Sequence, residues 1–516
     1  MTRYPFAFAV ASVAALLSLA GARPARADGD LSRVSHVIIV MQENHSYDNY
    51  FGVLPYAPGS PYHAAKPVCS GADHSCLDSL ACSFSAKGAL VCSNRNLDDD
   101  GHSVRVFHSP TRCIVPDLDH GWASTHREMN YANPNLALAK PLSDGFVRVN
   151  DATEQIDNGV ESPTDDGTIS YFDQTDLPFY YGLAETFAIS DRQFASVLGP
   201  TIPNRFYLMA ATSFGHLTTD DTVPPPGGYK PITGTIFDLL DQHGVSWGDY
   251  FEDVPQAALF RTPDAHTLPL SVFLAQAAGT LPGMPQVVFI DPNLGTTGTA
   301  QEDDEHPPTD IQRGQAHVST VVNAIRNGPY WKDSVIFITY DEHGGYYDHA
   351  KPPPAIQGGQ RTPDGIAPGQ CADLSNPPSS TQPGGGAECA VNPISTTDTS
   401  VKDAEALCPD LAANPTGPYP AQCASFDQLG VRVPLIAVSA FSKPSYVSHV
   451  ARDHTALLAL IEKRFMGGAA TSLTGRDRHA VSLEDMFDFD HAPSLNAAVG
   501  QASPPAVDCT PSRVGP

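Results

Sequence analysis

The chain has 516 residues, 41% hydrophobic and 17% charged, with a formal net charge of −27 at pH 7. This is an ordinary globular composition, long enough for one large α/β domain with insertions or for two domains. The acidic balance, with no Lys/Arg-rich run anywhere, argues against nucleic acid and anionic membrane surfaces as partners.

The first 27 residues, MTRYPFAFAVASVAALLSLAGARPARA, have the pattern of a secretory signal peptide. Arg3 precedes an apolar stretch over 6–22, and Ala25-Arg-Ala27 resembles a cleavage site. A membrane anchor is the alternative, although about 17 apolar residues are short for a span. We therefore predict cleavage after Ala27 and a mature protein that is secreted or periplasmic.

The polar stretch over 56–116 and the Pro- and Gly-rich stretch over 351–424 interrupt the strand and helix patterns. Both are predicted to be insertions in a scaffold, because long structureless segments in a compact protein are usually functional or insertional. Nine of the ten cysteines fall in or near these stretches: Cys69, Cys76, Cys82, Cys92 and Cys113, then Cys371, Cys389, Cys408 and Cys423, with Cys509 alone near the end. An even count in an exported chain predicts disulfides, and the absence of CxxC spacing argues against a structural zinc site. If all ten pair, at least one bridge must leave the group of five.

Short apolar runs alternate with helical patterns along the rest of the chain. Strands are expected at 34–41, 186–191, 286–291, 333–342 and 432–441, and helices at 317–329 and 454–465. Continuous apolar strands of this kind are typical of a parallel sheet that is buried on both faces. The sequence therefore predicts an α/β fold with a central, mostly parallel sheet and helices on both faces.

Polar residues stand where three of these strands end. Glu43 and Asn44 follow the first strand, Asp341 and Glu342 follow the strand after 333, and Thr201 follows the second strand in GPTIPNR. In such sheets ligands bind at the carboxyl ends of the strands, and hard oxygen ligands suit a divalent cation.

Each piece also has a plainer interpretation. Glu43-Asn44 and Asp341-Glu342 taken singly are typical of a helix cap or a solvated turn. Thr201 is typical of an N-cap for a helix that starts near Pro203, and His306 of a surface histidine in an acidic turn.

Five motifs occur in order along the chain: ENHSYDNYFG, GPTIPNR, DEHP, TYDEHGGYYDH and DHTALLALIEKRF. Together they resemble the signature of a secreted phosphoesterase family that includes bacterial and plant non-specific phospholipases C and an acid phosphatase branch, within the alkaline phosphatase and arylsulfatase superfamily. The similarity extends from about residue 32 to 465, with gaps at the two insertions. It implies an alkaline-phosphatase-like fold and a single phosphoesterase domain over 28–516.

The resemblance also implies roles for individual residues. It matches Glu43, Asn44, Asp341 and Glu342 to metal ligands, and Thr201 to a nucleophile that also touches the metal. It matches His120, His126 and His306 to histidines around the phosphoryl group. His349 and His454 lie in matched motifs without an assigned role, and Asp303 with His306 and His454 only partly suggests a second metal site. One divalent metal ion is therefore expected, either Ca, Zn, Mg or Mn.

The chemistry of these residue types agrees with the implied roles. A threonine at a helix N-terminus lies among free N–H donors and at the positive end of the helix dipole, where phosphate binds well. Metal coordination can activate its hydroxyl, and in-line attack would give a phospho-threonine intermediate that water then cleaves. His306 or His120 would stabilise charge or protonate the leaving alcohol.

The expected substrate is a phospholipid such as phosphatidylcholine, cleaved to diacylglycerol and a phosphorylated head group. The acid phosphatase branch tends to carry Ser in place of Thr201 and Asp in place of Glu342, which favours phospholipase C over a phosphatase of small phosphomonoesters. Zwitterionic head groups tolerate the acidic charge, which allows transient membrane contact. The sequence indicates no obligate protein partner. A non-catalytic binding protein with a structural metal is a third interpretation, but such a site has no need of Thr201.

Overall fold

The computed structural model describes residues 30–514, except for 99–100, 116, 130–141, 152–165, 218, 220–223, 225–226, 296–301, 357–362, 367–371, 376–425 and 513. The expected signal peptide and the four cysteines from Cys371 to Cys423 lie outside the described residues. Within the described residues, no helix is both long and apolar enough to cross a membrane.

The main scaffold alternates strands with helices. Its strands are β1 (His36–Gln42), β10 (Ala188–Ser190), β11 (Trp247–Phe251), β12 (Thr267–Pro269), β13 (Val287–Asp291), β14 (Ser334–Tyr340), β15 (Leu435–Ser439) and β16 (Val447–Ser448). The α-helices of the described residues include α1 (Tyr47–Phe51), α2 (Trp122–Glu128), α4 (Pro178–Thr186), α5 (Thr201–Ala210), α6 (Ile236–His243), α7 (Leu270–Ala277), α8 (Ile311–Arg326), α11 (Thr455–Phe465) and α12 (Gly475–His479).

The scaffold strands form one sheet in the order β12-β11-β13-β1-β14-β15-β10-β16. The neighbours pair in parallel, except that β15 runs antiparallel to both β14 and β10. The five predicted strands all belong to this sheet, and the predicted mostly parallel α/β fold is confirmed. The sequence analysis did not predict β11, β12 and β16.

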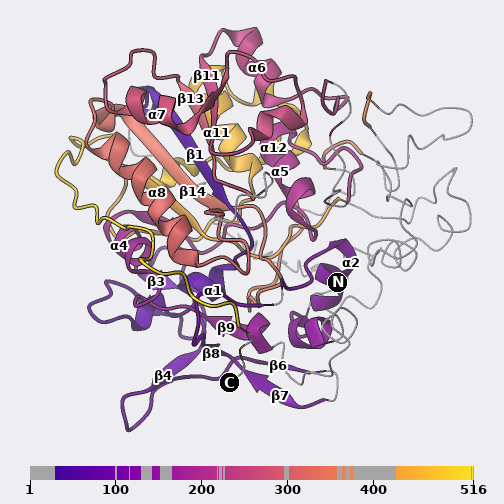
Figure 1. Cartoon of the computed structure of the whole chain (residues 1–516), viewed down its shortest axis with the longest axis vertical. Coiled ribbons are helices and arrows are strands. Elements are labelled where there is room, and N and C mark those ends of the chain that lie inside the picture. Colours follow the sequence, from indigo (N-terminus) through magenta and orange to yellow (C-terminus); the bar gives the residue numbers. More distant parts are fainter. Residues whose placement is uncertain are drawn as a thin grey trace, which may run out of the picture.

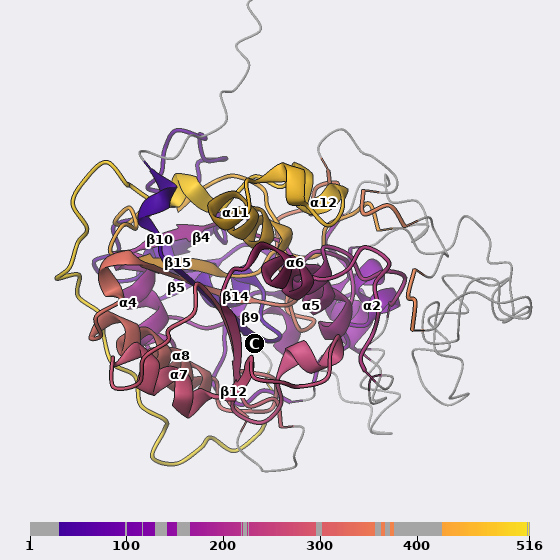
Figure 2. The same cartoon turned by 90° about the horizontal axis from the view of Figure 1, so that it is seen from above.

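Alternate residues of the central strands enter two different cores. Val37 and Ile39 of β1 pack with residues of α5, α6 and α11, whereas Ile38 and Val40 pack with residues of α1, α4, α7 and α8. Figures 1 and 2 show the sheet between these two groups of helices. This double burial is why the strands are apolar at every position.

The register of β1 and β14 decides where their polar ends meet. Gln42 is the direct partner of Tyr340, so the residues that follow the two strands emerge side by side. The backbone N–H of Asp341 donates to the Gln42 carbonyl oxygen at 3.1 Å, which extends the pairing one step beyond the strands.

The first insertion contains short strands: β2 (His63–Ala64), β3 (Cys76–Leu77), β4 (Cys82–Phe84), β5 (Leu90–Cys92), β6 (Arg95–Leu97), β7 (Ser103–Arg105) and β8 (Phe107–His108), the last of which pairs with β9 (Ser170–Tyr171). Disulfides link Cys69 to Cys76 and Cys82 to Cys92. A third disulfide joins Cys113 to Cys509, which confirms that one bridge leaves the group of five.

A third, smaller core lies under the insertion. It contains Leu80, Cys92 and Val104 of the insertion together with Phe146 and Tyr347. Tyr347 belongs to the loop after β14, so the insertion packs directly against the segment that carries Asp341 and Glu342. The predicted division into one domain with two insertions stays a prediction.

Candidate active site

Two polar turns meet at the ends of β1 and β14. The backbone N–H groups of Asn44 and Glu342 both donate to Oδ1 of Asp341, at 3.4 and 2.7 Å. Asn44 has φ +63°, a left-handed conformation that asparagine tolerates better than most residues. Gly344 has φ +61°, and a Cβ there would lie 2.2 Å from the Asn44 carbonyl oxygen, so this close approach of the two turns requires glycine.

A buried arginine joins the two acidic turns. Arg205 of α5 donates from Nη2 to Oε1 of Glu43 at 2.9 Å and from Nε to Oδ2 of Asp341 at 2.8 Å. Its side chain is 1% exposed, so the ion pairs lie in a region of low dielectric. The sequence analysis did not select Arg205, although it is the last residue of the GPTIPNR motif.

Thr201 is the first residue of α5, one helical turn before Arg205. Residues four apart lie on the same helix face, with Cβ atoms about 6 Å apart. The predicted place at a helix N-terminus is therefore confirmed, although the helix begins two residues earlier than expected. Pro200 holds the N-cap position and no side chain caps the helix, so Thr201 does not act as the N-cap. Thr201 is half-buried at the start of the helix that carries Arg205.

One side chain fixes the loop that leads to Thr201. The Asn204 side-chain oxygen accepts from the backbone N–H groups of Ser196 and Val197, at 2.8 and 3.0 Å. Its amide donates to the carbonyl oxygens of Gly199 and Pro200, at 2.8 and 3.0 Å. With all four hydrogen bonds formed, Asn204 holds the backbone before Thr201 in one conformation.

The donor set at this edge suits a divalent cation. Both polar atoms of the Asn44 side chain are buried without a hydrogen-bond partner among the described residues, and so is Oε1 of Glu342. Leaving such atoms unpaired costs about 1–3 kcal/mol each. Burial and the charges of Glu43 and Glu342 raise the pKa of Asp341 to about 8, although Arg205 opposes the shift. A cation among these oxygens would relieve both penalties, and it would share Glu43 and Asp341 with Arg205.

Two of the predicted histidines lie beside these acids. Nε2 of His120 is 3.7 Å from Oε1 of Glu342, Nε2 of His306 is 3.6 Å from Oδ2 of Asp117, and the two rings are 6.5 Å apart. Burial alone lowers the pKa of His120, but the charges of Glu342 and Asp117 outweigh it and raise the pKa to about 9. Burial likewise lowers the pKa of His306, but Asp117 and Glu43 raise it to about 9. Both rings are therefore cationic at neutral pH, as charge stabilisers or general acids require.

His126 lies behind this pair. Its Nδ1 is 2.6 Å from the Trp122 carbonyl oxygen on the same helix, and its ring centroid is 4.9 Å from that of Trp122. Burial lowers its pKa to about 4, so it is neutral at pH 7. The Trp122 ring in turn lies 3.1 Å from where a Cβ of Gly199 would stand, two residues before Thr201. The structure thus places His126 where it supports the loop that leads to Thr201.

His343 is a neighbour of the site that the sequence analysis did not select. Its Nε2 is 2.7 Å from Oε2 of Glu128, and its Nδ1 is 3.5 Å from Oε2 of Glu342. Burial lowers the pKa of His343, but the carboxylates of Glu128 and Glu342 raise it to about 9. Its place directly after Asp341-Glu342 in the motif was the available signal.

A buried carboxylate holds the loop that carries His306. Glu305 accepts hydrogen bonds from the hydroxyls of Tyr50, Tyr180 and Tyr340, at 2.6, 2.5 and 2.6 Å. Its backbone has φ +77°, a conformation that few side chains adopt. We call Glu305 with these three tyrosines the tyrosine cage.

The same loop is tied to the turn after β1 through its backbone. The Glu43 N–H donates to the Asp304 carbonyl oxygen at 2.9 Å, and the Gln42 amide donates to the Asp303 carbonyl oxygen at 2.9 Å. His306 is thereby fixed relative to Glu43.

The remaining candidates lie at three different places. The Asp303 carboxylate accepts from the Asn293 N–H at 2.6 Å and lies 3.6 Å from Nδ1 of His317. His454 contacts the Ser196 hydroxyl at 3.0 Å and the Tyr340 carbonyl oxygen at 2.9 Å, and burial lowers its pKa to about 4.

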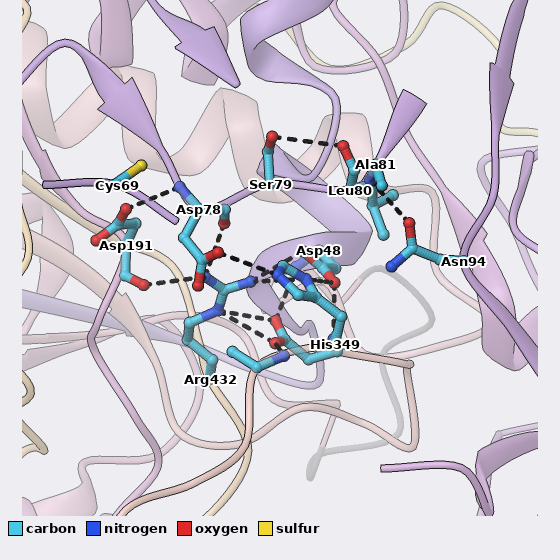
Figure 3. A network of polar contacts seen from close by, with 12 residues as sticks. Asp48, Cys69, Asp78, Ser79, Leu80, Ala81, Asn94, Asp191, His349 and Arg432 are labelled. Carbon is cyan, nitrogen blue, oxygen red and sulfur yellow. Dashed lines mark hydrogen bonds and ion pairs between the residues drawn. The ribbon is translucent and has the colours of Figure 1, made fainter. Parts of the chain in front are cut away.

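His349 belongs to a network around Arg432 that Figure 3 shows. Its Nδ1 is 2.6 Å from Oδ2 of Asp48, and its Nε2 is 3.2 Å from Oδ1 of Asp78. Arg432 donates to Asp48 at 2.9 Å and to Asp348 at 3.1 and 3.2 Å. We call these five residues the Arg432 network.

A known protein family matches most of this chain. The family model described as Phosphoesterase family matches residues 34–466. Non-specific phospholipase C6 of Arabidopsis thaliana is 26% identical over 470 residues, which cover 88% of this chain and 72% of that protein. Phospholipase C B of Mycobacterium tuberculosis is 26% identical over 569 residues, which cover 100% of this chain and 92% of that protein. Among solved structures, murine ectonucleotide pyrophosphatase/phosphodiesterase 5 aligns at 12% identity and a TM-score of 0.30, covering 60% of this chain and 94% of that one. Because the family match spans most of its length, this chain belongs to the Phosphoesterase family.

Proposed function

We propose that this chain is an exported, metal-dependent phospholipase C-type enzyme that cleaves phosphatidylcholine-like lipids into diacylglycerol and a phosphorylated head group. Family membership makes it a hydrolase of phosphoric ester bonds. The plant and mycobacterial relatives are named phospholipases C, which supports a phospholipid substrate. Three disulfides among the described residues support export to an oxidising compartment.

One observation carries the proposal. Thr201 begins the helix whose Arg205 binds both Glu43 and Asp341, so the expected nucleophile and the expected ligands belong to one assembly. A hydroxyl, an anion-binding helix N-terminus and a set of acids with unpaired oxygens are the parts that phosphoryl transfer needs.

Glu43, Asn44, Asp341 and Glu342 would hold one divalent metal ion, with the Thr201 hydroxyl beside it. When bound, the metal would polarise a phosphoryl oxygen and lower the pKa of the nucleophilic hydroxyl. Carboxylate and amide oxygens are the hard donors that calcium, magnesium and manganese prefer, and zinc also accepts carboxylates. The identity of the metal is to be decided by metal analysis of the purified protein.

The protein side chains supply the remaining steps. The Thr201 N–H at the positive end of α5 would bind a phosphoryl oxygen, since the Ile202 N–H donates to the Thr219 hydroxyl at 3.1 Å and Pro203 has no N–H. The Thr201 hydroxyl gives its proton to solvent as its Oγ attacks phosphorus in line, the ester bond to the diacylglycerol oxygen breaks, and the phosphorylated head group stays bound to Thr201 as a phospho-threonine. Cationic His120 or His306 stabilises the charge on the phosphoryl oxygens or gives its proton to the leaving oxygen. Water then cleaves the phospho-threonine and restores the hydroxyl.

The test offers three substrates to the wild-type protein and to Thr201→Ala: p-nitrophenyl phosphate, p-nitrophenylphosphorylcholine and phosphatidylcholine, each with and without chelator. We expect turnover of the two diesters by the wild type and a fall of about 10³-fold or more in kcat for Thr201→Ala. Thr201→Ser is the matched control and keeps measurable activity because it keeps a hydroxyl. Full activity of Thr201→Ala would exclude this nucleophile, and a preference for the monoester would identify an acid phosphatase instead.

A further inference from the structure

The β4–β5 hairpin of the first insertion carries apolar side chains on both of its faces. Phe84 pairs with Leu90 across the two strands, and Ser83 pairs with Val91, so Phe84 and Val91 point to opposite faces. Phe84 is 61% exposed and Val91 is 47% exposed. Leu90 packs on the third core and the Phe84 ring lies 6.5 Å from that of Tyr56, so this face is partly covered, but Phe84 and Val91 still expose apolar surface on the two faces of the ribbon.

The Cys82–Cys92 disulfide closes the base of this hairpin. Below the disulfide the ribbon is held by backbone and side-chain bonds: the Ser93 N–H donates to the Ala81 carbonyl oxygen at 2.9 Å, and the Ala81 N–H donates to the Asn94 side-chain oxygen at 2.8 Å. The outer half is therefore a short, constrained projection. A preordered apolar element loses little entropy when it inserts into a partner.

The two hairpins are less acidic than the chain as a whole, because over 79–105 three basic residues balance three acidic ones. Residues 79–97 contain Lys87 and Arg95 and no Asp or Glu, although the chain has 57 acidic residues. In the next hairpin Arg95 of β6 is the direct cross-strand partner of Arg105 of β7, and both are exposed. Neither arginine forms an ion pair with a described residue.

Like charges placed directly opposite each other destabilise a strand pair, so the arginine pair needs an anion. Leu97, which is 46% exposed, lies on the same face as Arg95. The Asp98 carboxylate folds back to accept the His102 N–H at 2.6 Å. The exposed face therefore combines two cationic groups with an apolar side chain.

Both hairpins lie on the side of the molecule that holds the candidate active site. Figure 1 shows β4, β6 and β7 beyond α1, on the side toward which β1 runs. The link is direct, because Asn94, between the two hairpins, approaches the Tyr347 hydroxyl at 3.5 Å, and Tyr347 belongs to the loop after Glu342.

We propose that the β4–β5 and β6–β7 hairpins form the surface that contacts a bilayer of zwitterionic phospholipid. Phe84 and Val91 enter the boundary between head groups and acyl chains, Lys87 extends its charge back to the head groups, and Arg95 and Arg105 bind lipid phosphates. A zwitterionic surface fits because the remaining acidic charge of the chain is repelled by an anionic one. The inference rests on the proposed function for the identity of the lipid.

The test measures flotation with phosphatidylcholine vesicles, with every variant in a Thr201→Ala background so that hydrolysis does not alter the vesicles. Phe84→Ser/Val91→Ser is expected to weaken vesicle binding by about tenfold or more, because two buried apolar side chains are lost. Arg95→Gln/Arg105→Gln is expected to weaken it by a few fold. Leu281→Ser is the matched control. Leu281 is 40% exposed but lies in the loop between α7 and the start of β13, at the opposite end of the strands from the candidate active site, and its loss should leave vesicle binding unchanged.

Thermal melting of each variant shows whether it is folded. Equal vesicle binding by folded Phe84→Ser/Val91→Ser and by its Thr201→Ala parent would overturn the proposal, and so would a parent that does not bind vesicles. A wild-type protein that binds vesicles but hydrolyses no phosphoester would overturn the proposed function and leave this surface in place.

Discussion

Two buried clusters of acids each surround an arginine, and they differ in how completely they are paired. In the Arg432 network all three guanidinium nitrogens donate, to Asp48, to Asp348 and to the carbonyl oxygens of Asp78 and Asp191. At the strand ends, Nη1 of Arg205 has no hydrogen-bond partner among the described residues, and the Asn44 amide is unpaired as well.

The difference separates a structural cluster from a ligand site. A buried ionic network that satisfies its own donors and acceptors holds the fold and needs nothing more. A buried cluster that leaves atoms unpaired is unfavourable unless a ligand completes it. The Asp48, Asp348 and His349 atoms converge closely enough to hold a metal, so the metal content of variants in each cluster is the measurement that distinguishes the two.

The largest effect is expected where the unpaired cluster loses a ligand. Asp341→Asn should lower kcat/KM by about 10³-fold and abolish tight metal binding, because it removes one negative charge and a donor oxygen. Metal content by elemental analysis and turnover of p-nitrophenylphosphorylcholine measure the two effects. Asp348→Asn in the Arg432 network is the matched control and should retain the metal stoichiometry. Loss of metal from Asp348→Asn alone would reverse the assignment of the two clusters.

Removing the arginine from the paired cluster should act on stability. Arg432→Met leaves the carboxylates of Asp48 and Asp348 buried without a counter-charge, which costs about 3–5 kcal/mol of unfolding free energy. Denaturant unfolding measures this change. The Lys463 side chain is 53% exposed and forms an ion pair with Glu484. Lys463→Met removes this exposed ion pair and should cost less than about 1 kcal/mol of unfolding free energy. Equal stability of the two variants would contradict a structural role for the Arg432 network.

The tyrosine cage should link the loop of His306 to catalysis. Glu305→Gln exchanges one acceptor oxygen for a donor beside three hydroxyl donors, so the loop shifts, and kcat should fall by about tenfold to a hundredfold with little change in KM. Because the effect acts through His306, Glu305→Gln should have no further effect on kcat in a His306→Ala background.

Asp364→Asn is the matched control for the cage, since Asp364 accepts from the Tyr207 and Thr212 hydroxyls at 2.9 Å each. Asp364→Asn should lower the melting temperature, and its effect on kcat should be the same with and without the His306 side chain. If Glu305→Gln and His306→Ala lower kcat independently, so that their effects multiply in the double variant, the tyrosine cage does not act through His306.

The smallest effect concerns the pH dependence of the Arg432 network. Burial by itself lowers the pKa of His349, but Asp48 and Asp78 raise it to about 10. Since the unfolded value is about 6.5, the stabilisation is complete below pH 6.5 and is lost as the pH rises toward 10. His349→Gln should cost about 1–2 kcal/mol at pH 6 and flatten this part of the profile. An unchanged slope of stability between pH 6.5 and 10 in the variant would show that other groups cause it.

The fold was predictable where the pattern is local and continuous. The apolar runs of β1, β13 and β14 predict a parallel sheet that is covered on both faces. The residues after β1 and β14 predict acidic turns at the carboxyl ends of the strands. The strand β11, with the sequence WGDYF, and the short β12 and β16 lack such a run, so no local pattern marked them.

Part of the candidate site was predictable for the same reason. Glu43-Asn44 and Asp341-Glu342 follow strong strands, and the register of β1 with β14 places the two pairs together. His349 has an equally suggestive motif, yet its partners are Asp48 and Asp78. A motif shows which residue types are present but not which way a loop turns them.

The sequence by itself determined five strands of the sheet, the helices α8 and α11 and the polar turns at the strand ends, because periodicity and strand ends are local properties of the chain. Only the tertiary structure decided that Arg205 bridges Glu43, 162 positions away, and that Tyr50 binds Glu305, 255 positions away. Such contacts depend on how helices and loops pack across the sheet. Hydrophobic periodicity fixes which face of an element is buried, but not which distant polar side chain it meets there.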